Sequence, residues 1–162
     1  MEELLSLLDE HDLWRNTVVV ITADHGQEIN ETGTNSWGHN SNFSRYQTQV
    51  PLLLFRPGAQ PAAYHHRTTH FDVAPTLLRE VFGITSPIRD YAVGTLLTDP
   101  AERGVLVLAN YSSIALMQDE ILVEMNPYGV AAVTDLELRP AAAPMPARML
   151  PQAAEIMARY RR

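Results

Sequence analysis

A run of β-branched residues, TVVVIT at positions 17–22, constrains the fold of this chain more than any other segment. The run does not alternate apolar with polar side chains, so as a strand it needs cover on both faces, as a central parallel strand has. It stops abruptly at Asp24, His25 and Gly26. Because ligands of open α/β sheets bind outside the carboxyl ends of the strands, we expect a functional site at this strand end.

Asp24 and His25 form a pair of potential metal ligands. A carboxylate oxygen beside an imidazole nitrogen suits a divalent cation, and Gly26 is expected to permit a tight turn that aims both side chains outward. The alternative is a turn in which Asp24 caps the following segment and His25 is merely exposed. Two residues alone do not decide between these interpretations.

Composition limits the class of protein. The length of 162 residues is typical of one domain, and a hydrophobic content of 46% is enough for a core. No apolar run approaches the roughly 20 residues that span a bilayer. The net charge of -7 argues against nucleic acid as a partner, although the 12 basic residues, all arginine, suit phosphate or sulfate. The absence of cysteine excludes disulfides, thiolate zinc sites and a cysteine nucleophile within these residues.

The first ninety residues predict two helices and two strands. Leucines at helical spacing indicate a helix before the first strand, and a second short strand spans 50–55. The polar segment 27–48 between the strands is a long loop that needs a functional reason. Residues 71–83 predict a second amphipathic helix that ends at Gly83, with one apolar face made of Ala74, Leu77, Leu78 and Val81.

The remainder of the chain has a different texture. Four short apolar segments separated by turn residues, at 105–109, 114–117, 121–125 and 130–133, predict an antiparallel meander. A proline- and alanine-rich linker at 139–151 and a short basic helix at 152–162 follow. We therefore predict an α/β chain with a partial doubly wound sheet over residues 1–90, a small antiparallel β subdomain over 91–138, and a tail over 139–162.

Two strands and two helices are too few to cover a strand that is apolar on both faces. We therefore expect that Met1 lies inside a larger α/β domain and that part of the sheet comes from elsewhere.

Four blocks in fixed order resemble the second half of the sulfatase-like branch of the alkaline phosphatase superfamily. They are TADHG at 22–26, VPLLLFRPG at 50–58, HFDVAPTLL at 70–78 and FGI at 82–84. The resemblance covers about residues 1–135. Within this branch the block WGHNSNFSRYQ at 37–47 is most similar to periplasmic domains anchored in the bacterial inner membrane.

The resemblance implies that Asp24 and His25 hold a divalent metal, which is zinc, manganese or magnesium, beside a nucleophile. It places His39 at the substrate or leaving group, where an imidazole donates a hydrogen bond or acts as a general acid. The alternative for His39 is a solvated loop histidine. Relatives supply a lysine for the anionic group, but this chain has no lysine, so Arg45 is the candidate replacement.

The nucleophile and the first acidic metal ligand belong to the first half of the family's domain, and neither is in this chain. We therefore expect the isolated chain to have a weak metal site and no turnover. Glu28 and Glu31 are predicted to be solvated loop acids rather than ligands.

Other histidines and acids have simpler interpretations. Asp72 is predicted to cap the second helix. His70 either reaches the site or packs, and packing is favoured. His65 and His66 point to opposite sides of an extended segment and are predicted to lie on the surface.

Two functions follow from the resemblance. One is a metal-dependent hydrolase or phosphotransferase that acts on phospho- or sulfo-esters. The other is a non-catalytic domain on the periplasmic side of the inner membrane that binds lipid or protein partners and regulates lipopolysaccharide and outer-membrane lipid homeostasis. Fold alone does not decide between them.

Overall fold

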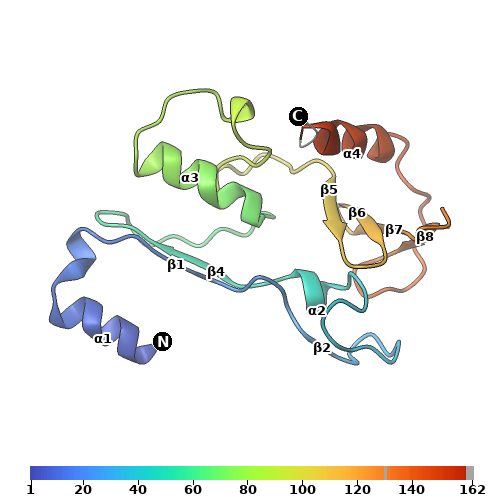
Figure 1. Ribbon diagram of the computed structural model, residues 1–162, viewed down its shortest axis with the longest axis horizontal. Helices are drawn as coiled ribbons and strands as arrows, with labels where there is room; N and C mark the ends of the chain where they lie inside the picture. The colour runs from blue at the N-terminus through green and yellow to red at the C-terminus, as the bar shows by residue number, and fades with distance from the viewer. Residues whose placement is uncertain (130, 160–162) are drawn as a thin grey trace. The chain divides into compact units, whose positions relative to one another are not determined.

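The computed structural model describes residues 1–129 and 131–159, and the chain forms two compact units, Met1–Ala62 and Ala63–Arg162 (Figure 1). Val130, at the start of the predicted strand 130–133, lies outside the described residues, as do residues 160–162 at the end of the predicted terminal helix.

The N-terminal unit is built on a pair of strands. Helix α1 (Glu2–Glu10) and the 3-10 turn η1 (Leu13–Arg15) lead into β1 (Val19–Thr22), which pairs with β4 (Leu52–Phe55). Both strands were expected from the sequence. The pairing is antiparallel, from Val19 opposite Phe55 to Thr22 opposite Leu52, so no parallel neighbour of β1 is present among the described residues.

The absence of further neighbours in the described part explains why β1 is half-buried instead of fully covered. An apolar run indicates that both faces of a strand need to be buried, but it does not indicate whether the neighbouring strand is parallel or antiparallel. Mixed sheets commonly carry an antiparallel strand, and here the connecting loop returns the chain to the end of β1 at which it left.

The loop between β1 and β4 has structure of its own. It contains the short hairpin of β2 (Glu28–Ile29) and β3 (Trp37–Gly38), followed by the single-turn helix α2 (Arg45–Thr48). This segment carries the candidate residues His39 and Arg45.

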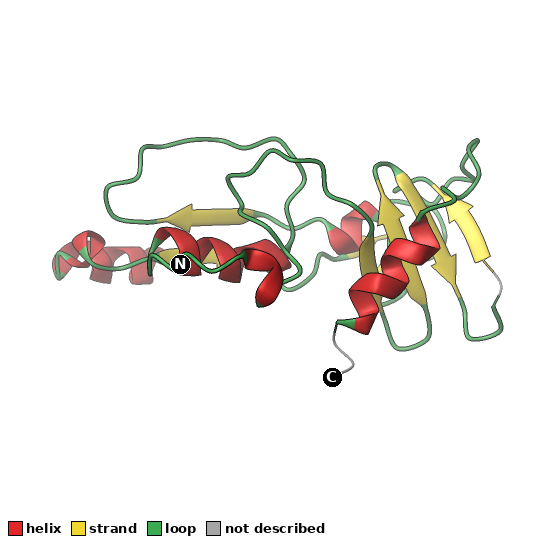
Figure 2. Ribbon diagram, turned by 90° about the horizontal axis from the view of Figure 1, so that it is seen from above, coloured by secondary structure: helices red, strands yellow, loops and turns green. Residues whose placement is uncertain are grey.

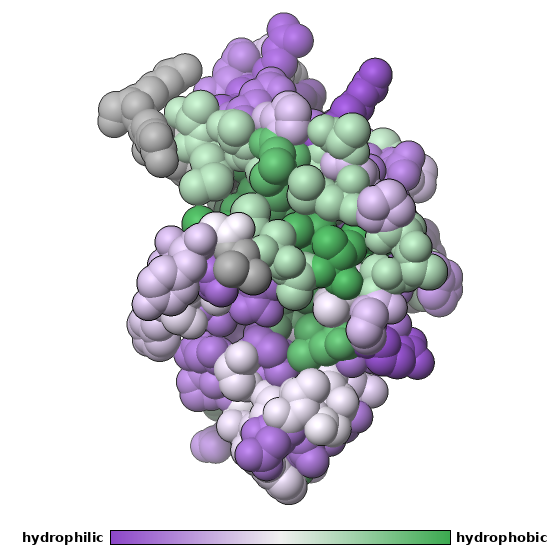
Figure 3. Space-filling model, turned by 90° about the vertical axis from the view of Figure 1, so that its right-hand side faces the viewer, coloured by the Kyte–Doolittle hydropathy of each residue, from purple (hydrophilic) through white to green (hydrophobic). Residues whose placement is uncertain are grey.

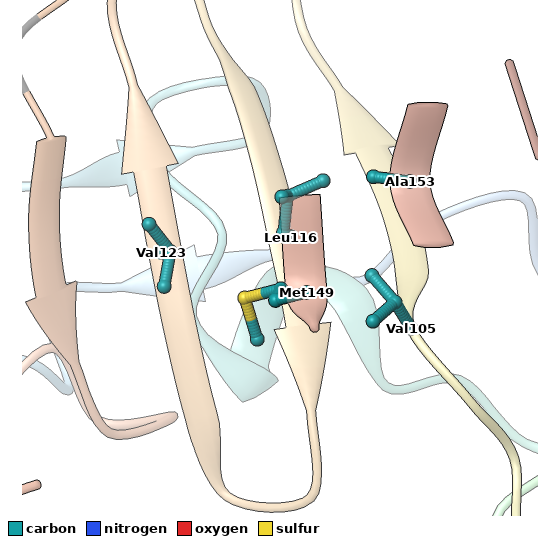
Figure 4. Close-up of a cluster of buried hydrophobic side chains, with 5 residues drawn as sticks. All are labelled: Val105, Leu116, Val123, Met149 and Ala153. Carbon is teal, nitrogen blue, oxygen red and sulfur yellow. The ribbon is translucent and has the colours of Figure 1, made fainter. Parts of the chain in front are cut away.

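The C-terminal unit contains the predicted meander. Its four strands pair in sequence order and antiparallel, and they are β5 (Leu106–Ala109), β6 (Ile114–Gln118), β7 (Ile121–Met125) and β8 (Ala131–Thr134). Helix α4 (Met149–Ala158) lies across one face of this sheet (Figure 2). Figure 4 shows the contact, in which Met149 and Ala153 of α4 pack over Val105, Leu116 and Val123.

The second predicted helix begins with the 3-10 turn η2 (His70–Asp72), continues as α3 (Val73–Glu80) and is followed by the turn η3 (Ile88–Asp90). Gly83 follows α3 with φ +67°, as expected for a glycine that ends a helix.

The buried face of α3 differs from the prediction. Pro75 and Thr76 are buried, whereas Ala74 and Val81 are exposed. The cause is polar: the Thr76 hydroxyl donates to the Asp72 carbonyl at 2.6 Å and accepts the Leu97 amide at 2.8 Å. A later segment of the chain is therefore fixed to the side of the helix that carries Thr76, while Leu77 and Leu78 of the predicted apolar face are half-buried.

Large apolar side chains are exposed in both units, among them Leu4, Leu7, Leu53, Phe71 and Phe82. Figure 3 shows one face of the molecule on which apolar side chains gather between hydrophilic margins. Exposed apolar area of this kind is typical of surfaces that bind other protein or ligands.

Candidate functional site

Asp24 and His25 follow β1 directly and are open to solvent, with side chains 89% and 44% exposed. The Oδ2 atom of Asp24 lies 3.6 Å from Nε2 of His25, and the other carboxylate oxygen accepts the His25 amide at 3.1 Å. The two donors expected from the sequence are therefore adjacent at the end of the strand.

A hydrogen bond at Nδ1 orients the imidazole of His25. Nδ1 lies 2.8 Å from the Gly26 carbonyl oxygen, which can only accept, so Nδ1 carries the hydrogen. Nε2 is then the ring nitrogen on the side of Asp24 that can bind a cation when it carries no hydrogen. A backbone carbonyl commonly holds a metal-binding histidine in this tautomer.

The pair fits a divalent cation in chemistry and spacing. Tetrahedral ligands with bonds of about 2.1 Å stand about 3.4 Å apart, close to the separation of Asp24 Oδ2 and His25 Nε2. Within residues 1–129 and 131–159, however, no group of three or more acidic or histidine side chains is placed to hold a metal ion. The described residues therefore supply half of a typical ligand set.

His39 lies against His25. The two imidazole rings stack with their centroids 4.4 Å apart and an interplanar angle of 21°. The fold thus brings His39, which lies fourteen positions after His25 in the sequence, against the pair of Asp24 and His25, and leaves His39 exposed. Arg45 is half-buried at the start of α2, and its role in substrate binding stays a prediction.

Gly26 has a different role from the tight turn predicted for it. It is absent from the glycines with positive φ. Its amide instead donates to the Gln47 carbonyl at 2.8 Å, and a Cβ at this position would lie 2.1 Å from the Tyr46 carbonyl oxygen. Glycine is needed because the backbone of α2 passes directly over the residue that follows the metal-ligand pair.

Glu28 is fully buried, so the prediction of a solvated loop acid is wrong. Its carboxylate accepts hydrogen bonds from Asn42 Nδ2 at 2.7 Å, Ser44 Oγ at 3.0 Å and Gln47 Nε2 at 3.2 Å, and from the amide and hydroxyl of Thr32. Burial acts to raise the pKa of Glu28, but these hydrogen bonds outweigh it and lower the pKa from 4.5 to about 2.

The Glu28 network explains how a polar loop holds a fixed shape. Ser36 and Ser41 join it, because Gln47 Nε2 also donates to Ser41 Oγ at 2.7 Å and the two serine hydroxyls are hydrogen-bonded to each other. In the β2–β3 hairpin Glu28 pairs with Gly38, the residue before His39. The strand pairing of Glu28 therefore lies next to His39 in the chain.

The signal for this network was present in the sequence. An acid in a loop that is rich in serine, asparagine, threonine and glutamine has enough donors to be buried. Glu31, in contrast, is exposed as predicted, and its carboxylate accepts the Ile29 amide.

Three predictions for histidines outside the site can be compared with the structure. His65 is exposed as predicted. His66 is half-buried, with Nε2 2.9 Å from the Leu97 carbonyl oxygen, so it is less exposed than the prediction implied. His70 is exposed, which differs from the packed position that was favoured. None of these three histidines contributes to the stacked pair of His25 and His39.

Asp72 caps η2 as predicted, since it accepts the Thr69 amide at 2.8 Å in a capping box. It also does more. Its carboxylate accepts the Thr95 amide at 2.8 Å and forms an ion pair with Arg103 at 3.3 Å, and the two charged side chains are only 1% and 8% exposed. Asp72 is therefore a structural centre of the C-terminal unit.

A family model described as Sulfatase matches residues 1–84, and the chain belongs to this family. It is 28% identical over 138 residues to the inner membrane protein YejM of Salmonella typhimurium, covering 84% of this chain and 22% of YejM. It is 30% identical over 117 residues to a choline-sulfatase of Rhizobium meliloti, covering 70% of this chain and 22% of that protein.

The fold comparison agrees with the family assignment. The crystal structure of Ps i-CgsB matches 98% of this chain and 39% of that chain, with a TM-score of 0.61 and 15% sequence identity. The chain thus has part of a sulfatase-type α/β fold, and it spans about a fifth of the length of the two curated relatives. In the part of the chain that the structure describes, no helix has the length and apolar character needed to cross a membrane.

Proposed function

We propose that this chain supplies the metal-binding strand end of a sulfatase-like hydrolase or phosphotransferase that acts on phospho- or sulfo-esters. The observation that carries the proposal is the exposed cluster of Asp24, His25 and His39 directly after β1. The imidazole of His25 contacts both the Asp24 carboxylate and the imidazole of His39 there, although His39 is distant from the other two in sequence.

Each side chain has a role in this proposal. Asp24 Oδ2 and His25 Nε2 hold a zinc, manganese or magnesium ion, and the bound ion supplies Lewis-acid stabilisation of the ester's anionic oxygens. His39 donates a hydrogen bond to an ester oxygen or a proton to the leaving group. Arg45 binds the anionic group of the substrate through its guanidinium.

The catalytic centre needs residues beyond the described ones. We propose that a nucleophile and a further acidic ligand come from another part of the sulfatase domain. In support, the described residues provide two adjacent donors only, β1 has a single strand neighbour among them, and apolar side chains of both units are exposed. Alone, the chain is expected to be inactive.

The proposal can be tested by replacing His25 with alanine in the protein that carries the remaining sulfatase domain. Loss of a direct ligand is expected to lower kcat/KM for an aryl phosphate or sulfate more than about a hundredfold, since even the hydrogen-bonding partners of a metal ligand typically contribute 10- to 100-fold. His65→Ala, an exposed histidine outside the site, is the matched control. Metal-dependent turnover that is equal in both variants would refute the assignment.

A second function is supported by the similarity to YejM over most of the chain. In this proposal the domain lies on the periplasmic side of the inner membrane, binds lipid or a protein partner without turnover, and regulates lipopolysaccharide and outer-membrane lipid homeostasis. It is favoured if the protein with its complete sulfatase domain binds metal yet hydrolyses neither ester.

A further inference from the structure

Two tyrosines are the most exposed of the large hydrophobic side chains in the described part of the chain. Tyr111 is 96% exposed and Tyr128 is 91% exposed, and both belong to the meander of the C-terminal unit. A tyrosine ring has a large apolar surface, and exposing it to water is unfavourable. Two such exposed rings therefore suggest a surface that binds something.

The strand register places the two rings at the same end of the sheet. Ile114 of β6 pairs with Ala109 at the end of β5 and with Met125 at the end of β7, and Met125 pairs in turn with Ala131. The turns 110–113 and 126–129, which carry the tyrosines, therefore lie at the same end of the sheet. We call these two turns the tyrosine tips.

The tips are held in defined conformations. The Asn110 side-chain oxygen accepts the amides of Ser112 and Ser113 at 2.9 and 2.8 Å, and that of Asn126 accepts the Tyr128 amide at 2.9 Å. Turns that are capped by side chains in this way are preorganised. Binding through the tyrosine rings therefore costs little additional conformational entropy of the chain.

Charge distinguishes the two ends of the sheet. The tip sequences, Asn-Tyr-Ser-Ser and Asn-Pro-Tyr-Gly, contain no charged residue, although the chain carries a net charge of -7. At the opposite end the β6–β7 turn presents Asp119 and Glu120. The two turns with the tyrosines are thus uncharged and aromatic, whereas the turn at the other end carries two acids, one of which, Glu120, pairs with Arg67 at 3.3 Å.

We propose that the tyrosine tips insert into the headgroup region of a phospholipid bilayer. Tyrosine suits this region because its ring is apolar and its hydroxyl stays hydrated, which is why tyrosine is enriched at membrane interfaces. The inference deepens the membrane-associated function proposed above and rests on it for the choice of membrane. It requires neither the metal nor an ester, so its failure leaves the metal site untouched.

The test is co-sedimentation of the 162-residue chain with vesicles of phosphatidylcholine, with and without an anionic phospholipid, over a range of lipid concentrations. Tyr111→Ser/Tyr128→Ser is expected to lower the partition coefficient about tenfold or more, because two buried rings are lost. Tyr64→Ser/Tyr91→Ser is the matched control, since it removes two exposed tyrosines of the same unit away from the tips and should bind as wild type. Tyr111→Trp/Tyr128→Trp should retain binding.

Other outcomes overturn the proposal. Equal binding of the tip variant and the control does so, as does the absence of vesicle binding by a chain whose circular dichroism shows it to be folded. Binding that needs anionic lipid and ignores the tips would assign the contact to arginines. Because tyrosine, serine, asparagine and glycine also form protein-binding loops, concentration-dependent dimerisation that only the tip variant loses would assign the tips to a second copy.

Discussion

Replacing Asp72 with alanine is expected to lower the free energy of unfolding of the C-terminal unit by about 3–5 kcal/mol. The substitution leaves the Arg103 guanidinium, 8% exposed, without its carboxylate partner. It also removes the acceptor of the Thr69 and Thr95 amides. Removing one partner of a buried ion pair costs more free energy than the intact pair contributes, because the other charge stays buried without a partner.

Urea unfolding followed by far-UV circular dichroism measures this change. Glu155→Ala removes an acid from an exposed position of helix α4 in the same unit and is the matched control, expected to change stability by about 1 kcal/mol or less. A double variant, Asp72→Ala/Arg103→Met, should recover part of the loss, since the unpaired charge is gone. A single variant at Asp72 as stable as the control contradicts the structural role given to this residue.

Acidification is expected to destabilise the N-terminal unit through Glu28. The folded-state pKa of about 2 lies below the ordinary 4.5, so the carboxylate stabilises the fold fully above pH 4.5, and this contribution is lost as the pH falls toward 2. The shift corresponds to about 3 kcal/mol. Glu28→Gln should therefore cost a similar amount at neutral pH, and the difference from wild type should shrink as the pH falls.

Trp14 and Trp37 are the chain's only tryptophans and both lie in the N-terminal unit, so tryptophan fluorescence follows its unfolding. The control is Glu31→Gln, an exposed acid of the same loop. It should change stability by about 1 kcal/mol or less. A difference between Glu28→Gln and wild type that stays constant from pH 7 to pH 2 is incompatible with the buried, hydrogen-bonded carboxylate described for Glu28.

Local patterns in the sequence predicted the elements well. The alternation of apolar segments with turn residues located the strands of the meander within one or two residues, and leucine spacing located α1. The apolar character of β1 predicted a need for cover, whereas the antiparallel direction of β4 depended on how the loop returns. Periodicity likewise identified α3 but not its buried side, which is set by hydrogen bonds to distant residues such as Leu97.

The candidate site shows the same division. The sequence alone identified Asp24 and His25 as a candidate ligand pair, because the two residues are consecutive and follow the end of an apolar strand. The stack of His39 on His25 depends on the path of the β2–β3 hairpin, and the close approach of Tyr46 to Gly26 depends on the path of α2. Such contacts join residues through tertiary structure, and no local pattern encodes them.

Metal binding by the protein that carries the whole sulfatase domain tests the central claim most directly. Calorimetric titration with zinc, manganese and magnesium should show an ion bound by the wild type, and an affinity at least about a hundredfold weaker in Asp24→Asn/His25→Ala. The control Asp90→Asn/His65→Ala, at two exposed positions outside the site, should bind as the wild type does. Equal affinity in all three proteins, or no bound ion in the wild type at saturating metal, would contradict a metal site at the end of β1.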